Sequence, residues 1–216
     1  MKYISFIFFK LILLQSDKVL LAQAVYNDGY VQYSVNIAEA SNPEYVKYFK
    51  DAVMKIYIRG MHTRTELRTA LGNTITIFDK QTGAAIVLNE YGDQKILIRM
   101  TAEQFNQSNS KYLNPVIEQS AEEKKINGYL CKHAKVKFAD GSIFSIYFSP
   151  DLEFNNTYYG IPVELEGFPL EYESKIGNMK VVYKAEKISL DPVSINLFQV
   201  PEAGYREMKY EENPRD

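Results

Sequence analysis

A period of two in hydrophobicity runs through most of the chain from Tyr26 onward. In the segment MKIYIR at residues 54–59, for example, large aliphatic side chains occupy alternate positions. This alternation is typical of a β-strand that presents one face to a core and the other to water. Similar runs occupy residues 31–37, 64–70, 74–79, 84–89, 95–100, 129–138, 142–148 and 179–188. Together the runs predict roughly nine to eleven strands.

Short breaks rich in Gly, Asn and Asp separate these runs, as at Asp140-Gly141. Asp-Gly between two alternating runs is a strong hairpin signal, so consecutive strands should pair as an antiparallel meander. Residues 159–172 differ because Pro162 and Pro169 each remove a backbone donor. We expect that stretch at a sheet edge, at a bulge or in an irregular crossing.

The composition supports a sheet protein with a single core. The 216 residues include 17 Tyr and 12 Phe but no Trp, and aromatic side chains fit a pleated, half-buried surface. With 46% hydrophobic residues and a formal charge of −2, neither disorder nor a strip that binds nucleic acid is expected. The one cysteine, Cys131, excludes an internal disulfide and any multi-cysteine metal site.

Two segments depart from the period of two and predict helices. Asn42-Pro43-Glu44 has the character of a helix start, and Tyr45, Tyr48 and Phe49 then fall on one apolar stripe that continues to Ala52. Thr101 and Gln104 have the spacing of a capping box, which predicts a second, short helix.

The amino-terminal segment has the pattern of an export signal. Residues 1–14 are a basic start followed by an apolar run, and Ala22-Gln23-Ala24 fits a small-x-small cleavage site. The alternatives are a short membrane-associated anchor or an amphipathic start that stays attached. A membrane-spanning helix is not expected, because the apolar run is too short to cross a bilayer. We predict a signal peptide over residues 1–23, a single β domain over 24–208 and a charged tail over 209–216.

The sequence lacks most of the known catalytic motifs. The sequence has no Gly-x-Ser-x-Gly, no His-Glu-x-x-His, no P-loop and no dinucleotide-binding motif. Cys131 and His133 lie two apart on one predicted strand, which permits an activated thiolate or two metal ligands. We favour a packed cysteine beside a surface histidine, because a metal site needs three or four ligands and His62 is distant. Glu122-Glu123-Lys124-Lys125 is typical of a solvated turn, and no catalytic residue, metal or cofactor is predicted.

A sheet of this size must curl, close or be covered, because one face of it cannot stay wet. If it curls into a half-barrel around the first helix, that helix forms a movable lid through Tyr45, Tyr48 and Phe49, and an apolar ligand would fit beneath it. A closed, dry core made of the same residues is the alternative. The residues expected on the concave face are Ile56, Ile58, Ile75, Ile77, Ile86, Leu88, Ile96, Ile98, Phe144 and Ile146.

With these residues laid out, a family resemblance becomes visible. In order, the segments Met54–Gly60, Arg64-x-Glu66, Thr82-Gly83, Ile98-x-Met100-Thr101 and Ile126–Ala134 resemble those of exported bacterial proteins of unknown function related to the GLPGLI family. Gly167–Glu171 and Phe198–Tyr205 resemble the later signatures of that group. The likeness spans about residues 29 to 208.

The GLPGLI-related group is similar in fold to LolA and its relatives, the periplasmic carriers of lipoproteins. These carriers are half-barrels in which helices plug an apolar cavity, and the resemblance implies that fold here. A basic residue at the end of an early strand holds their helical lid by hydrogen bonds, and Arg59 is the matching position. The carriers follow that residue with proline, whereas this chain has Gly60.

The sequence is compatible with three functions. The first is a periplasmic or secreted, non-enzymatic binding protein that holds a lipid or other apolar ligand in a half-barrel cavity. The second is a structural or protein-interaction module of the cell envelope, with a dry core and a protein partner. The third is an enzyme that uses Cys131 and His133. No nucleic-acid partner is expected, and the sequence makes no prediction of oligomeric state.

Overall fold

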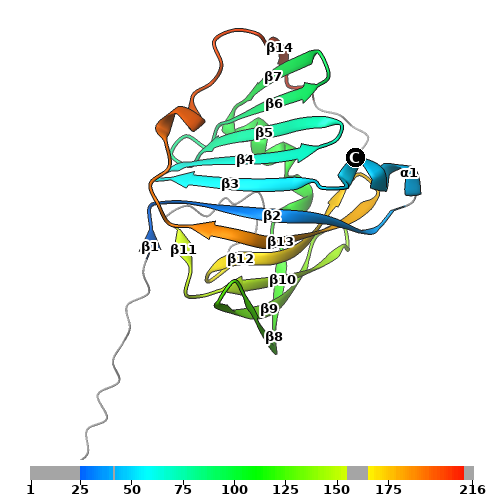
Figure 1. Ribbon diagram of the computed structural model, residues 1–216, viewed down its shortest axis with the longest axis vertical. Coiled ribbons are helices and arrows are strands. Elements are labelled where there is room, and N and C mark those ends of the chain that lie inside the picture. Colours follow the sequence, from blue (N-terminus) through cyan, green and yellow to red (C-terminus); the bar gives the residue numbers. More distant parts are fainter. Residues whose placement is uncertain (1–24, 41, 155–164, 212–216) are drawn as a thin grey trace, which may run out of the picture.

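The computed structural model describes residues 25–40, 42–154 and 165–211 (Figure 1). The predicted signal peptide, part of the proline-containing stretch and the last five residues of the predicted tail lie outside the described residues. The strands are β1 (Val25–Tyr26), β2 (Asp28–Glu39), β3 (Val53–Arg59), β4 (His62–Thr69), β5 (Gly72–Asp79), β6 (Ala85–Tyr91), β7 (Gln94–Met100), β8 (Val116–Ile126), β9 (Tyr129–Lys137), β10 (Ile143–Ser149), β11 (Glu153–Phe154), β12 (Phe168–Ile176), β13 (Met179–Ser189) and β14 (Arg206–Lys209). The helices are α1 (Pro43–Val46) and α2 (Ala102–Ser108), with 3₁₀ turns η1 (Lys47–Phe49), η2 (Ser110–Tyr112) and η3 (Ile195–Phe198).

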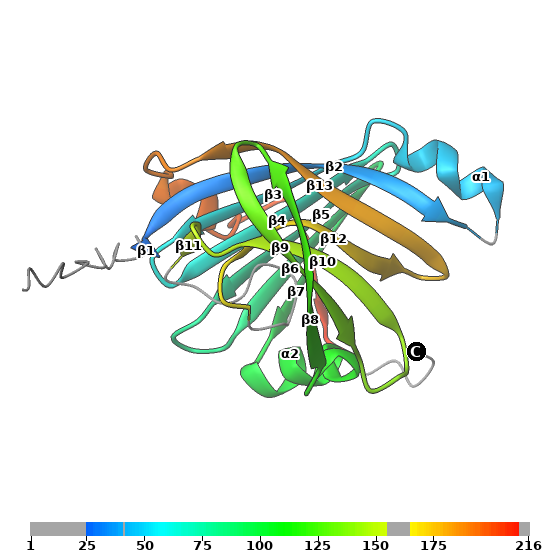
Figure 2. The ribbon, with the colours of Figure 1, turned by 90° about the horizontal axis from the view of Figure 1, so that it is seen from below.

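Twelve of the described strands form one sheet in the order β14-β7-β6-β5-β4-β3-β2-β13-β12-β10-β9-β8. All neighbours are antiparallel except β14 and β7, and β1 pairs separately with β11. The sheet curls strongly, and α2 lies on its concave side (Figure 2). The predicted curled antiparallel sheet is confirmed, but it contains more strands than the nine to eleven expected from the sequence.

The strand register divides the sheet into two faces. Directly paired residues point to the same side of a sheet. One row runs across five strands through Ile56, Thr65, Thr76, Val87 and Ile98. This row belongs to the concave face, and the row beside it, from Tyr57 through Ile86 to Arg99, belongs to the outer face.

The main core lies on the concave face where β2, β3, β9, β10, β12 and β13 meet. Val31, Tyr33 and Ile56 are fully buried there, and the Tyr33 hydroxyl donates to the carbonyl of Pro169 at 2.7 Å. The rings of Tyr172 and Tyr183 stack with centroids 4.7 Å apart. This half of the sheet is packed solidly from strand to strand.

A second core forms on the outer face of β4 to β7. The C-terminal strap, which we define as residues 190–205, includes η3 and leads to β14 at the sheet edge (Figure 1, orange to red). From the strap, Val193 and Phe198 bury their side chains against the sheet. Their buried partners are Ile75, Ile77, Leu88 and Leu97.

Three local predictions need correction. The stripe beginning at Tyr45 forms only α1 and η1, because the turn at Lys50 and Asp51 ends the helical hydrogen bonding, with Asp51 at φ 60°. The predicted solvated turn at residues 122–125 lies within β8, where charged side chains suit an exposed edge strand. β12 lies inside the sheet rather than at an edge, and a register shift between Tyr147 and Phe148 accommodates Pro169, as the bulge alternative predicts.

Candidate functional site

The ten residues predicted to line one concave face are divided between two faces. Ile56, Ile58, Ile96 and Ile98 share the concave face, and Phe144 and Ile146 belong to the main core on that side. Ile75, Ile77, Ile86 and Leu88 lie on the outer face, under the C-terminal strap. The prediction of a common face is wrong for these four, because the strap makes the outer face of β5 and β6 apolar as well.

Burial changes along the concave face. Ile56 and Ile58 in β3 have no exposed surface, whereas Ile96 and Ile98 in β7 are only partly buried. Between these strands the face carries Thr65, Thr74, Thr76 and Val87, all partly buried. The packed half of the face therefore passes into a half-covered part on β4 to β7.

Helix α2 closes one end of that half-covered part. The side chain of Thr101 accepts from the backbone N–H of Gln104, and the Gln104 side chain accepts from the N–H of Thr101, so the predicted capping box is present. The Phe105 ring stacks on Phe78 of β5 with centroids 5.2 Å apart, on the same face as Ile98. The helix on the concave side is therefore α2, not the predicted lid.

The predicted lid segment lies at the end of β2. Tyr45 is 52% exposed, Tyr48 is half-buried against the main core, and Phe49 is buried in it. The carbonyl of Tyr48 accepts from the backbone N–H of Ala70 at 3.0 Å, which ties the segment to the turn after β4. The apolar stripe was thus predicted correctly only in part, since one of its three aromatic rings points into solvent.

Arg59 ends β3, as predicted, but its contact is with a different segment. Its guanidinium donates to the carbonyl of Val193 in the C-terminal strap, not to the helix that contains Tyr45. Arg64 makes an equivalent bond, from Nη1 to the carbonyl of Leu197 at 2.7 Å. Two arginines on neighbouring strands therefore hold the strap.

Cys131 and His133 have separate surroundings. Cys131 is fully buried in the main core, and burial raises the pKa of its thiol to about 11. His133 is also buried, contrary to the surface position expected, and its two ring nitrogens lie 2.8 and 2.9 Å from the hydroxyls of Ser120 and Ser145. A thiol with a raised pKa is a poor nucleophile, so the geometry offers no activated cysteine.

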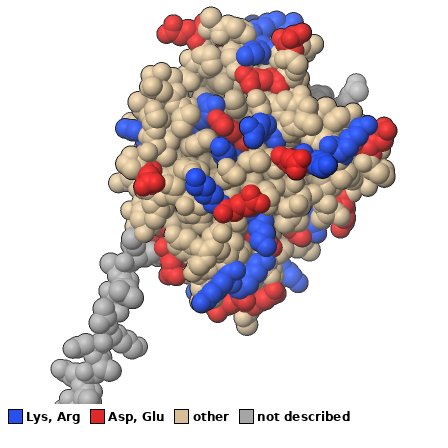
Figure 3. Space-filling view, viewed as in Figure 1, with Lys and Arg blue, Asp and Glu red and all other residues tan. Residues whose placement is uncertain are grey.

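Clustered metal ligands and long apolar helices are absent from the part of the chain that the structure describes. Among these residues no group of three or more His, Cys, Asp or Glu side chains is placed to hold a metal. Within the same residues, none of the helices has the length and apolar character that a membrane crossing requires. On the side shown in Figure 3, Lys and Arg are interspersed with Asp and Glu.

The comparison with protein families matches the part of the chain that builds these features. A model described as a domain of unknown function, DUF4412, covers residues 46–205, from the end of α1 to the end of the strap. The chain belongs to the DUF4412 family. The DUF4412 region therefore includes both faces of β3 to β7, α2 and the strap. No curated protein matches the sequence.

Among solved structures, the DUF4412 chain is similar to one of PNGF-II, with 12% identity and a TM-score of 0.48 over 85% of this chain and 32% of that one. It is also similar to an uncharacterized conserved protein from Thermus thermophilus, with 9% identity and a TM-score of 0.48 over 85% and 91% of the two chains. LprF from Mycobacterium bovis matches with 9% identity and a TM-score of 0.35 over 78% and 88%. The DUF4412 chain thus spans about a third of the PNGF-II chain that it matches.

Proposed function

We propose that this DUF4412 protein is an exported, non-enzymatic binding protein that holds a lipid or other apolar ligand against the concave face of β4 to β7. One observation carries the proposal. Along a single face, burial falls from complete at Ile56 and Ile58 to partial at Ile96 and Ile98. Large aliphatic side chains that their own fold covers only in part favour an apolar partner over water.

The chemistry of this half-covered face suits a hydrocarbon chain. Val87, Ile96 and Ile98 provide branched aliphatic contacts, while Thr65 and Thr76 add methyl groups beside small hydroxyls. Each methylene group that a ligand buries contributes about 0.8 kcal/mol. Helix α2 bounds the site through Phe105, so a shift of α2 would alter access to the face.

Displacement of a hydrophobic fluorophore tests this function. The purified mature protein should bind the dye saturably, and a long-chain fatty acid or phospholipid should compete. Ile98→Asn should weaken lipid binding about tenfold, as expected for the loss of one aliphatic contact. Ile86→Asn is the matched control, because Ile86 is also half-buried but faces outward. If no lipid displaces the dye, or both variants weaken binding equally, the proposal is wrong.

A structural or protein-interaction module of the envelope is the second candidate. The tight burial of Val31, Tyr33, Ile56 and Ile146 favours it, because these side chains fill the space between their strands. Native mass spectrometry of protein purified from its own envelope, followed by solvent extraction, separates the two candidates. A retained lipid supports the first, and a specific envelope protein without lipid supports the second.

Export to the periplasm or medium, kinship with the GLPGLI family and a LolA-like carrier fold are part of the same proposal. The amino-terminal pattern and the motif order support them. Amino-terminal sequencing of the exported protein should give a start at Ala24.

Replacing Cys131 with Ala tests the enzymatic alternative. The variant should bind the ligand as the unchanged protein does, whereas loss of function in this variant would support an enzyme that uses Cys131.

A further inference from the structure

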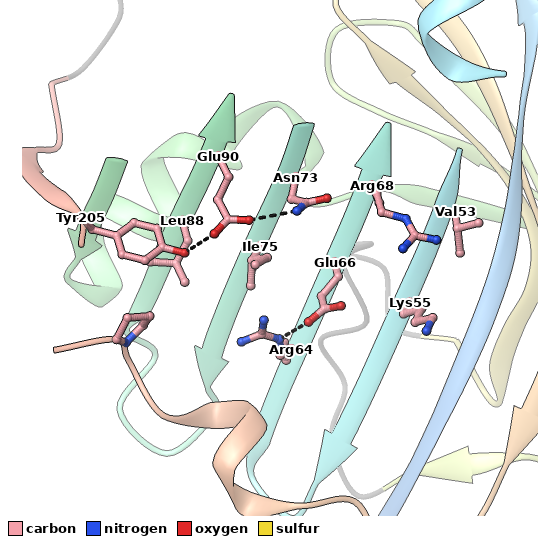
Figure 4. Close-up of a pocket in the computed structure, with 11 residues that line it drawn as sticks. Val53, Lys55, Arg64, Glu66, Arg68, Asn73, Ile75, Leu88, Glu90 and Tyr205 are labelled. Carbon is pink, nitrogen blue, oxygen red and sulfur yellow. Dashed lines mark hydrogen bonds and ion pairs between the residues drawn. The ribbon is translucent and has the colours of Figure 1, made fainter. Parts of the chain in front are cut away.

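A pocket lies on the outer face of β3 to β6, on the side of the sheet opposite to α2 (Figure 4). Its volume is about 350 Å³, within the range of small-molecule sites. The strap supplies Pro201 and Tyr205 as one wall. The floor consists of two neighbouring cross-strand rows, Val53-Arg68-Asn73-Glu90 and Lys55-Glu66-Ile75-Leu88, and Arg64 stands in the next row.

Both acidic residues of this outer pocket already have partners within the fold, and Lys95 Nζ lies 3.6 Å from the Glu90 carboxylate. Arg64 Nε donates to Glu66 at 2.5 Å. Glu90 accepts from Asn73 Nδ2 at 2.9 Å and from the Tyr205 hydroxyl at 2.5 Å. The hydrogen bonds from Asn73 and Tyr205 hold the pKa of Glu90 below its usual range, so it is ionised and fully engaged. Glu90 therefore anchors the Tyr205 wall.

The two remaining charges of the pocket are positive and unmatched. Neither Lys55 nor Arg68 forms a salt bridge or side-chain hydrogen bond with any described residue. They stand on adjacent strands, in adjacent rows, and both line the pocket at the end away from Tyr205 (Figure 4). An ammonium beside a guanidinium is an arrangement that attracts a carboxylate, because the guanidinium can donate two parallel hydrogen bonds.

The other end of the pocket is lined mainly by apolar side chains, with the Glu90 carboxylate held at the Tyr205 hydroxyl. Ile75 is 8% exposed and Leu88 is 1% exposed, and the Tyr205 ring and Pro201 stand beside them. A ligand with its charge at Lys55 and Arg68 would place its body on these side chains. The pocket therefore combines a cationic end with an aromatic and aliphatic end.

We propose that this outer pocket binds a small carboxylate with an apolar body about the size of one ring. The carboxylate lies between Lys55 and Arg68, and the ring lies over Ile75 and Leu88 against Tyr205. This site is separate from the proposed lipid-binding face, because the two occupy opposite sides of the sheet. It gives the protein a second, chemically distinct ligand.

An NMR titration with 3-phenylpropionate tests this site on the intact mature protein. Saturable shifts are expected at the backbone amides of Lys55, Arg68 and Ile75. The neutral analogue 3-phenylpropan-1-ol should bind at least about tenfold more weakly, since it lacks the charged hydrogen bonds. Equal binding of acid and alcohol, or shifts confined to other residues, would overturn the proposal without any need for variants.

Two variants test whether Lys55 and Arg68 bind the carboxylate. R68Q and K55Q should each weaken binding of the acid about fivefold to tenfold, as expected for one charged hydrogen bond near a surface. K135Q is the matched control, because Lys135 is an exposed lysine on β9, in the other half of the sheet. Unchanged affinity in both R68Q and K55Q would refute the site. Ile98→Asn should leave acid binding intact, so failure here and failure of lipid binding are distinguishable.

Discussion

Phe198→Ala tests whether the C-terminal strap is an integral part of the fold. Phe198 is 9% exposed and packs in the second core with Val193 and the outer-face residues of β5 to β7. Truncating a buried Phe costs about 3 to 5 kcal/mol, and a site beneath a surface strap relaxes or hydrates more easily than a deep one. We therefore expect the free energy of unfolding to fall by about 3 kcal/mol.

Urea denaturation followed by circular dichroism measures this change. With a slope of about 2 kcal/mol per molar, the midpoint should fall by about 1.5 M. Ile195→Ala is the matched control, because Ile195 lies in the same η3 turn but is 46% exposed. Its effect should stay below about 0.5 kcal/mol, as for other surface positions. Similar midpoints for the two variants would show that the strap does not share in the cooperative core.

Three further predictions concern single positions. Cys131 should resist thiol reagents at about pH 8 in the native protein and react in denaturing urea, because its raised pKa keeps it protonated; rapid native labelling would contradict this. Arg59→Gln should speed hydrogen exchange in the strap, since the bond to Val193 is lost; unchanged exchange would refute the role assigned to it. Gly72→Ala should cost about 2 to 3 kcal/mol in thermal unfolding, because its Cβ would lie 1.9 Å from the Glu90 carbonyl oxygen. Gly92→Ala, at φ +56° with open space around it, should cost about 1 kcal/mol; the reverse order would argue against this register.

The sequence was sufficient for most of the longer strands and for their antiparallel hairpins, because alternation and turn residues are local properties. It was not sufficient for the side on which each strand places its aliphatic residues. Alternation of apolar and polar residues in β5 predicts that Ile75 and Ile77 share one face of the sheet. That this is the outer face follows from the strap, which packs against it. The strap has no regular hydrophobic period, so its sequence does not indicate which face of the sheet it covers.

The outer pocket could not be predicted for a related reason. Lys55, Arg68 and Glu90 come from three strands, and Tyr205 follows about 115 residues after Glu90. Only the register across β3 to β6 and the path of the strap bring them together. The edge strand β8 was missed because its charged residues 122–125 resemble a solvated turn when their pairing with β9 is unknown.

The pairing of β2 with β13 has a consequence for the order in which the molecule assembles. Ser34 and Lys184 are direct partners in the middle of the sheet, although 150 residues separate them along the chain. Strands β2 to β7 form one ribbon, and β8, β9, β10 and β12 form another. Within the twelve-stranded sheet of the described residues, β13 is the strand that joins the two ribbons. Closing so long a loop is slow compared with forming hairpins, so the two ribbons should form first and join only when β13 pairs with β2.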